Sequence, residues 1–306
     1  MNKSSIIFSI LTFFTLLISC EKEIELKLDN GQDKLVVNSL FYPDTNFRVY
    51  VTSTKLINEN KNTFINNAEV KLYENGIFLE DLIFEADGWY ISSFNPKYNT
   101  KYKIEVNHPV GNVYAESYVP DSTLFYGEYS AVSTCNDNYI TSRGDYKLTI
   151  INNNVIERFY QTMELTIFQT EVDYLDISDP TLLADSEIEF NPKSFFFSNS
   201  LFSGDTNVIS ISKSGVSEAN YFTSCETYAQ YLSDQFIHTK TLSKEYYLFL
   251  KTWVKHRYNQ NSDANIIEPT KLIFQGEPIE MYSNVVGGYG VFAGFNKTIV
   301  EFVYVP

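Results

Sequence analysis

The fold class of the chain follows first from the stretch Ala68-Glu69-Val70-Lys71-Leu72-Tyr73-Glu74-Asn75-Gly76-Ile77. Apolar and polar residues alternate from Ala68 to Tyr73, so one face of this segment is buried and the other is exposed, as in a β-strand. Asn75-Gly76 is the strongest short hairpin signal, because both residues tolerate a positive φ. The stretch therefore predicts a hairpin whose return strand covers residues 77–84.

Similar short runs lie on both sides of this hairpin. They cover residues 35–40, 47–51, 89–91, 102–106 and 113–119, and turn residues such as those at 43–46 separate them. The chain is also rich in strand-forming aromatics, with 24 Phe and 23 Tyr. About seven strands at this spacing predict an antiparallel β-sandwich over residues 34–120.

The remainder, residues 121–306, is expected to form a second, β-rich domain. Strand-like runs occur at residues 146–150, 163–168, 195–197, 208–211 and 298–304, and the acidic stretch 171–189 is interpreted as a loop. One helix is predicted near residues 243–258. Ser243 is its expected N-cap, and apolar residues recur at the spacing of one helix face, at Tyr246, Phe249, Leu250, Trp253 and Val254.

A glycine-rich segment, residues 283–294, lies between this helix and the last strand. Its glycines are not a dinucleotide-binding fingerprint, because no crossover helix begins at them. We expect Gly287, Gly288 and Gly290 to form a structural turn or bulge where strands approach closely.

The N-terminus has the pattern of an export signal. Lys3 precedes an apolar run, residues 6–18, that is short for a membrane span, and the run ends at Leu17-Ile18-Ser19-Cys20. This ending resembles the lipobox of bacterial prolipoproteins, which implies that residues 1–19 are removed and that Cys20 receives acyl chains such as palmitate. The alternative is an ordinary secretory signal with an incidental cysteine.

Residues 20–33 are expected to be a lipidated tether. Their acidic start, residues 21–25, resembles the signal that sends Bacteroidota lipoproteins to the outer face of the outer membrane; a simple solvated tether is the alternative. Loss of Lys3 with the signal changes the formal charge from −15 to −16. Such an acidic protein repels phosphate backbones, so nucleic-acid binding is not expected.

Two cysteines remain once Cys20 is assigned to lipid. An exported protein leaves the reducing cytoplasm, so Cys135 and Cys225 are a candidate disulfide, although two separate buried thiols remain the alternative. The bond would close a loop of about 90 residues, worth roughly 4–5 kcal/mol in the chain-entropy model.

Weaker patterns suggest other sites. Asp121-Ser122-Thr123 resembles the O-glycosylation site of Bacteroidota, with Ser122 as acceptor, but a plain linker is favoured. Calcium at Asp173, Asp176 and Asp179 is a weak possibility against a solvated acidic loop, because the Asp-x-Asp-x-Asp-Gly spacing is absent. The three histidines, His108, His238 and His256, form no zinc motif, and no Gly-x-Ser-x-Gly elbow occurs.

The order of several motifs resembles a family of Bacteroidota outer-membrane lipoproteins of unknown function, the domain-of-unknown-function family 4249. The matching segments are Cys20–Glu25, Leu35–Pro43, Leu72–Gly76, Leu201–Asp205 and Asn284–Gly294. The resemblance implies genes beside TonB-dependent receptors and an immunoglobulin-like or transthyretin-like N-terminal part. It implies no catalytic residues.

We therefore expect a non-enzymatic, lipid-anchored protein of the outer membrane, displayed on the cell surface, that assists a TonB-dependent receptor in ligand capture or uptake. A stand-alone adhesin that binds a glycan or peptide is the first alternative. The second is a hydrolase whose site is built from dispersed carboxylates.

Overall fold

A computed structural model describes residues 33–55, 63–135, 139–151, 156–163, 172–187, 194–218, 236–260 and 279–305. The described chain is mainly β, with one long helix, as the sequence predicts. None of its described helices is long and apolar enough to cross a membrane.

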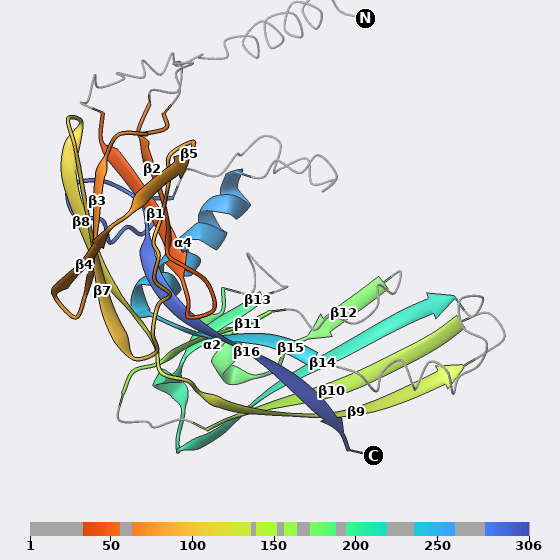
Figure 1. Cartoon of the computed structure of the whole chain (residues 1–306). Coiled ribbons are helices and arrows are strands. Elements are labelled where there is room, and N and C mark those ends of the chain that lie inside the picture. The colour runs from red at the N-terminus through yellow and green to blue at the C-terminus, as the bar shows by residue number, and fades with distance from the viewer. Residues whose placement is uncertain are drawn as a thin grey trace, which may run out of the picture. The chain divides into compact units, whose positions relative to one another are not determined.

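The N-terminal part is a β-sandwich of two antiparallel sheets (Figure 1). One sheet contains, in spatial order, β1 (Leu35–Phe41), β2 (Arg48–Ser53), β6 (Trp89–Ile91) and β5 (Ile83–Ala86); the other contains β4 (Ile77–Asp81), β3 (Glu69–Glu74), β7 (Thr100–His108) and β8 (Gly111–Val119). The predicted β3–β4 hairpin is present, and both of its turn residues have positive φ, 50° for Asn75 and 82° for Gly76.

The prediction of a single return strand over residues 77–84 is wrong. The segment divides at Leu82, which is 7% exposed and packs into the core, so that β4 lies at the edge of one sheet and β5 at the edge of the other. The reason is packing, because an inward-pointing leucine at this point closes the side of the sandwich.

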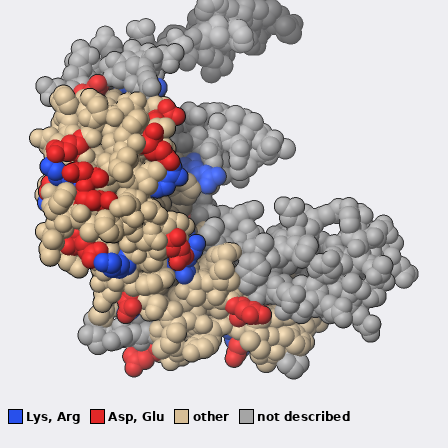
Figure 2. Space-filling model, in the orientation of Figure 1, with Lys and Arg blue, Asp and Glu red and all other residues tan. Residues whose placement is uncertain are grey.

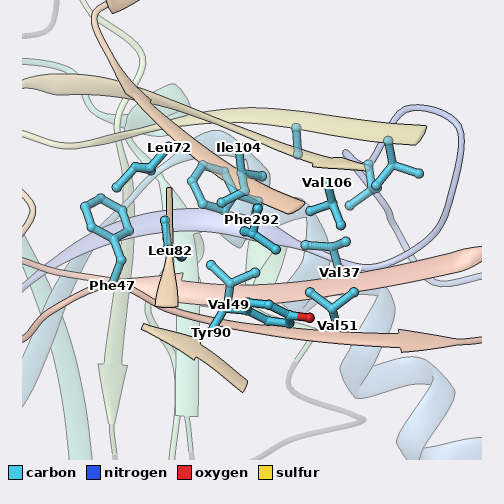
Figure 3. Packing of buried hydrophobic residues seen from close by; sticks show 14 of the residues in the cluster. Val37, Phe47, Val49, Val51, Leu72, Leu82, Tyr90, Ile104, Val106 and Phe292 are labelled. Carbon is cyan, nitrogen blue, oxygen red and sulfur yellow. The ribbon is translucent and has the colours of Figure 1, made fainter. Parts of the chain in front are cut away.

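The core of this sandwich lies between its two sheets (Figure 3). Val37, Val49 and Val51 project from one sheet, and Leu72 and Ile104 project from the other. The C-terminal strand also contributes to this core through Phe292, which is fully buried and lies 4.6 Å from Phe41 between ring centroids. A residue about 250 positions away therefore completes the first core.

The second part of the chain consists of two further groups of strands and short helical elements. The first group contains β12 (Val172–Asp176), β14 (Thr206–Glu218), β10 (Tyr139–Ile151) and β9 (Leu124–Cys135); the second contains β13 (Ser194–Ser198), β11 (Phe159–Met163) and β15 (Phe236–Leu242). The short helical elements are α2 (Pro180–Asp185) and a 3-10 turn, Asn199–Leu201. Residues such as Tyr146, Leu148 and Phe197 form the core that the two groups share.

β16 (Phe292–Tyr304) joins these sheets, and it begins six residues before the predicted strand (Figure 1). Its first residues pair parallel with β1, its middle pairs antiparallel with β15, and its last residues pair parallel with β9. Strands from the two ends of the chain are therefore hydrogen-bonded neighbours.

The predicted helix is confirmed as α4 (Lys244–Gln260). The Ser243 hydroxyl accepts a hydrogen bond from the Tyr246 backbone N–H at 3.3 Å, as an N-cap does. The apolar face of the helix packs on β11, β13, β15 and β16 through residues that include Leu250 and Val254.

The predicted acidic loop, residues 171–189, is wrong, because β12 and α2 occupy most of it. The Asp179 carboxylate caps α2, accepting hydrogen bonds from Thr181 N at 2.9 Å and Leu182 N at 3.4 Å. Asp179-Pro180 is a helix-start signal in the sequence, since Asp suits the N-cap and Pro the first turn.

Asp185, at the end of α2, ties this helix to α4. Its carboxylate accepts hydrogen bonds from the Tyr247 hydroxyl, from Lys251 Nζ at 2.6 Å and from Ser198 N at 2.6 Å. Burial raises the pKa of this carboxyl, but the bonds from Lys251, Tyr247 and Ser198 outweigh it and hold the pKa below its ordinary value. The carboxylate is therefore charged in the folded protein at neutral pH.

Candidate functional site

The glycine-rich segment lies against the first sandwich. The Tyr289 N–H donates to Leu35 O at 2.9 Å, and its carbonyl accepts from Val37 N at 2.8 Å. On the other sheet, Val286 and Tyr114 exchange two backbone hydrogen bonds, of 2.8 and 3.3 Å. The segment thus bridges β1 and β8 at one end of the sandwich.

The three predicted turn glycines lie where this segment is closest to the strands. Gly287 and Gly290 have φ of +87° and +116°, which L side chains rarely adopt. A Cβ on Gly288 or Gly290 would also lie closer than 3.0 Å to the carbonyl oxygen of Leu35 or Val37. These glycines therefore allow the backbone of the glycine-rich segment to lie directly against the backbone of β1.

The Asn284 side chain closes the loop that contains the glycines. Its Oδ1 accepts from Phe292 N at 3.0 Å, and its Nδ2 donates to Phe292 O at 2.8 Å and to Glu116 O at 3.0 Å. The Asn284 side-chain amide thus exchanges two hydrogen bonds with the Phe292 backbone, as a neighbouring strand would, and its bond to Glu116 O fixes the loop to β8.

Helix α4 holds the residues just before this loop. The Tyr282 N–H donates to Thr252 Oγ1 at 2.9 Å, and His256 Nδ1 donates to Ile279 O at 2.9 Å. Residues 279–291 therefore run from α4 to the sandwich and are hydrogen-bonded at both ends.

A cavity of about 800 Å³ lies between β1, α4 and this segment. We call it the seam pocket, and its lining residues are Val36, Asn38, Phe249, Thr252, Glu280, Met281, Tyr282, Ser283, Val285, Gly288, Tyr289 and Gly290. Its volume lies within the range of small-molecule sites, about 300–1,000 Å³. The seam pocket is therefore our candidate functional site.

The walls of the seam pocket combine aromatic rings with few polar groups. Phe249 and Tyr282 are half-buried, whereas Tyr289 is 47% exposed. Lys34 Nζ lies 5.1 Å from the Tyr289 ring centroid and 3.5 Å from its hydroxyl. Burial, and to a smaller extent the charge of Glu245, raises the pKa of Tyr282. A neutral Tyr282 phenol beside apolar ring faces suits binding better than proton transfer.

Among the described residues that line the seam pocket, the predicted site residues are Gly288 and Gly290. Cys20 and Cys225 lie outside the described residues, and Cys135 ends β9. Ser122 is exposed in the connection between β8 and β9, where its N–H donates to Asp121 Oδ1 at 2.9 Å. The lipid, disulfide and glycosylation assignments therefore stay predictions.

The three candidate calcium ligands do not form a described site. Asp173 and Asp176 belong to β12, and nothing is described of their side chains, while Asp179 accepts three backbone N–H groups, including that of Ser210 at 3.1 Å. No group of three or more His, Cys, Asp or Glu side chains among the described residues is arranged to hold a metal ion.

The sequence patterns identify the glycines of the seam pocket but not its α4 wall. Phe249 belongs to the predicted apolar helix face. The spacing of apolar residues along that helix, however, does not indicate that Phe249 and Thr252 lie beside residues 280–283. Asn284 is part of a recognised segment, yet its triple hydrogen bonding depends on Glu116 and Phe292 and has no local sequence signal.

One family profile matches the chain over residues 21–299, and its description is Domain of unknown function (DUF4249). None of the curated proteins matches the chain.

Proposed function

We propose that the chain, which belongs to the DUF4249 family of domains of unknown function, is a lipid-anchored binding protein. It captures a ligand in the seam pocket and works with a TonB-dependent receptor of the outer membrane. The observation that carries this proposal is the seam pocket itself, about 800 Å³ in volume and walled by three separate parts of the chain.

The build of the seam pocket supports binding of a ligand with flat apolar faces. Phe249, Tyr282 and Tyr289 offer rings, and Asn38, Thr252 and Ser283 contribute polar atoms. Asn38 Oδ1 already accepts from Val291 N at 3.2 Å, and Thr252 Oγ1 from Tyr282 N, so these residues also hold the walls in place. A preformed wall lowers the ordering cost of binding.

The anchor and the receptor rest on the sequence. The lipobox-like ending at Cys20 supports attachment through acyl chains, and the acidic residues 21–25 support display on the outer surface. The family resemblance supports the Bacteroidota source and the receptor partner.

A stand-alone glycan-binding protein is the second candidate, because Tyr289 presents an exposed ring in the wall of a mainly apolar pocket. A hydrolase would need two carboxylates about 5–10 Å apart. Glu280 is the one carboxylate among the described residues that line the seam pocket.

Purification through an affinity tag on the full chain tests the receptor partnership. Outer membranes are dissolved in a gentle detergent, and the proteins that stay with the tagged chain are identified by mass spectrometry. We expect a TonB-dependent receptor in stoichiometric amount. Recovery of the chain with no receptor would contradict the partnership.

Glycan arrays separate the second candidate from the first. Binding by the wild-type chain that is lost in Tyr289→Ala but kept in Tyr98→Ala would favour a glycan-binding protein. Tyr98 is a matched control because it is 49% exposed and does not line the seam pocket.

A further inference from the structure

The outer face of one sandwich sheet continues the wall of the seam pocket. Asn38 of β1 lines the pocket and is the cross-strand partner of Tyr50 of β2, which in turn pairs with Trp89 of β6. Cross-strand partners project from the same face of a sheet, and the neighbours Val37 and Val49 point the other way, into the core. Asn38, Tyr50 and Trp89 therefore form one row of about 10 Å that starts at the pocket and crosses the outer face.

The end of the row away from the pocket is an aromatic platform. The Tyr50 and Trp89 ring centroids lie 4.8 Å apart, with 34° between the ring planes, and the Phe64 centroid lies 6.1 Å from that of Tyr50. Phe64 is 37% exposed, and Tyr50 and Trp89 are half-buried. Arg48 Cζ lies 4.9 Å from the Trp89 centroid, and Arg48 Nη2 donates to Glu85 Oε2 at 2.7 Å. Rings that reach solvent thus lie beside exposed hydrogen-bonding groups.

The seam pocket, at the other end of the row, offers neutral polar groups that the protein itself does not use. Asn38 Nδ2 and the Tyr282 hydroxyl make no hydrogen bond to a described residue, and both atoms are open to solvent. Ser283 Oγ accepts from Val285 N at 3.3 Å, and among the described residues its own proton has no acceptor. A ligand in the pocket therefore meets two hydroxyls and an amide, which suit uncharged hydrogen-bonding groups.

Charge is balanced at both ends of the row. Glu280 is the one carboxylate among the described residues that line the pocket, and Lys34, whose Nζ lies 3.5 Å from the Tyr289 hydroxyl, brings one positive charge to the same wall. At the platform, Arg48 and Glu85 form an ion pair. The described residues in Figure 2 likewise carry acidic and basic groups in small, mixed clusters, with no broad basic surface in this view. With a formal charge of −15, the chain repels anionic polymers, so a neutral ligand fits best.

We infer that the ligand is a neutral oligosaccharide, with one sugar ring in the seam pocket and the following units along the row towards Trp89. A sugar ring combines an apolar C–H face with a rim of hydroxyl groups, and aromatic faces beside neutral hydroxyls and an amide complement both. A chain of sugars follows rather than a single sugar, because Trp89 lies two strands away from the pocket wall. The inference rests on the proposed binding function and names the class of its ligand.

Calorimetric titration of the full chain with cellohexaose, maltohexaose, xylohexaose and mannohexaose tests the ligand class. The corresponding monosaccharides are the controls for length, and hexagalacturonic acid is the control for charge. We expect at least one neutral hexasaccharide to bind, and its monosaccharide and the acid to bind roughly tenfold or more weakly. No binding of any neutral hexasaccharide at millimolar concentration, equal affinity for its monosaccharide, or tighter binding of the acid would each overturn the inference.

Variants test the platform separately from the pocket. Trp89→Ala should weaken binding of the hexasaccharide roughly tenfold or more, because it removes a ring of the platform, and should leave binding of the monosaccharide unchanged. Tyr126→Ala is the matched control, because Tyr126 is 57% exposed on β9, outside the row, and this variant should bind as the wild type does. Melting curves check folding, and Trp89→Leu, which keeps apolar packing but loses the ring, should weaken binding in the same way. Unchanged hexasaccharide affinity in both Trp89 variants would overturn the inference.

The mass of the natural occupant separates this inference from the proposed function. Native mass spectrometry of the full chain, purified from membranes in gentle detergent, would give the mass of the species that stays bound. A saccharide mass supports the inference. A bound species that is not a saccharide overturns the ligand class and leaves the binding function standing, whereas the absence of any bound species contradicts both.

Discussion

Gly290→Ala is the sharpest single test of how the glycine-rich segment is held. Gly290 has a φ of +116°, and a Cβ there would lie closer than 3.0 Å to the Val37 carbonyl oxygen and carbon. A non-glycine residue in such a conformation costs roughly 1–3 kcal/mol. Overpacking against backbone costs about 1–3 kcal/mol more.

The expected loss is therefore about 2–6 kcal/mol from a free energy of unfolding that is typically about 5–15 kcal/mol. At about 2–4 °C per kcal/mol for a chain of this size, the melting temperature should fall by roughly 5–20 °C.

Substitutions at two other glycines separate the cost of backbone strain from the cost of steric overlap. Gly76 has a φ of +82°, and a Cβ added to it would have no neighbour within 4 Å, so Gly76→Ala should cost only the strain, about 1–3 kcal/mol. Gly204 has neither a positive φ nor a neighbour within 4 Å, so Gly204→Ala should be neutral or stabilising by up to about 1 kcal/mol.

Thermal and urea denaturation of the full chain would measure this series. Amide hydrogen exchange at Val37 and Ser39 adds a local readout, because these amides donate to Tyr289 O and Val291 O at 2.8 and 2.7 Å. Faster exchange at both amides is expected in Gly290→Ala. Melting and exchange equal to those of Gly204→Ala would refute the close backbone contact.

Three further predictions concern other parts of the chain. Cys20→Ala should move the protein from the membrane pellet to the soluble fraction and abolish labelling by radioactive palmitate; a variant that stays labelled contradicts the anchor. Asn284→Ala should lower the free energy of unfolding, measured by urea denaturation, by about 1.5–4.5 kcal/mol, since it removes three hydrogen bonds of about 0.5–1.5 kcal/mol each. The exposed Asn112→Ala should leave it unchanged. The pKa of Asp185 is lowered by folding, so its stabilising effect is complete above the unfolded pKa of about 4 and is lost as the pH falls through the folded value. Melting curves between pH 2 and 7 should therefore be flatter in Asp185→Asn, and parallel curves would argue against this assignment.

Much of the fold could be predicted because its signals are local. The alternation before Asn75-Gly76 and the apolar spacing after Ser243 are periods of single elements, and β3, β4 and α4 follow from them. The helix-start signal at Asp179-Pro180 is equally local, but the acidic residues around it led to the prediction of a loop.

The remaining features depend on partners distant in sequence. Leu82 turns inward because a second sheet lies opposite, and β16 begins early because β1 offers it a free edge. The seam pocket has the same origin, since α4, β1 and residues 280–290 meet only in the folded chain. Glycine spacing identifies one wall of the pocket and cannot identify the others.

Seam-pocket occupancy is the most direct test of the proposed binding function. Val36→Trp would fill the pocket from β1, and Leu40→Trp places the same ring on the same face of that strand outside the lining. Native mass spectrometry would compare both variants with the wild type, each purified as the full chain from membranes in gentle detergent. We predict one bound species on the wild type and on Leu40→Trp that is missing from Val36→Trp. The same species on Val36→Trp, or none on the wild type, would contradict a binding function for the pocket.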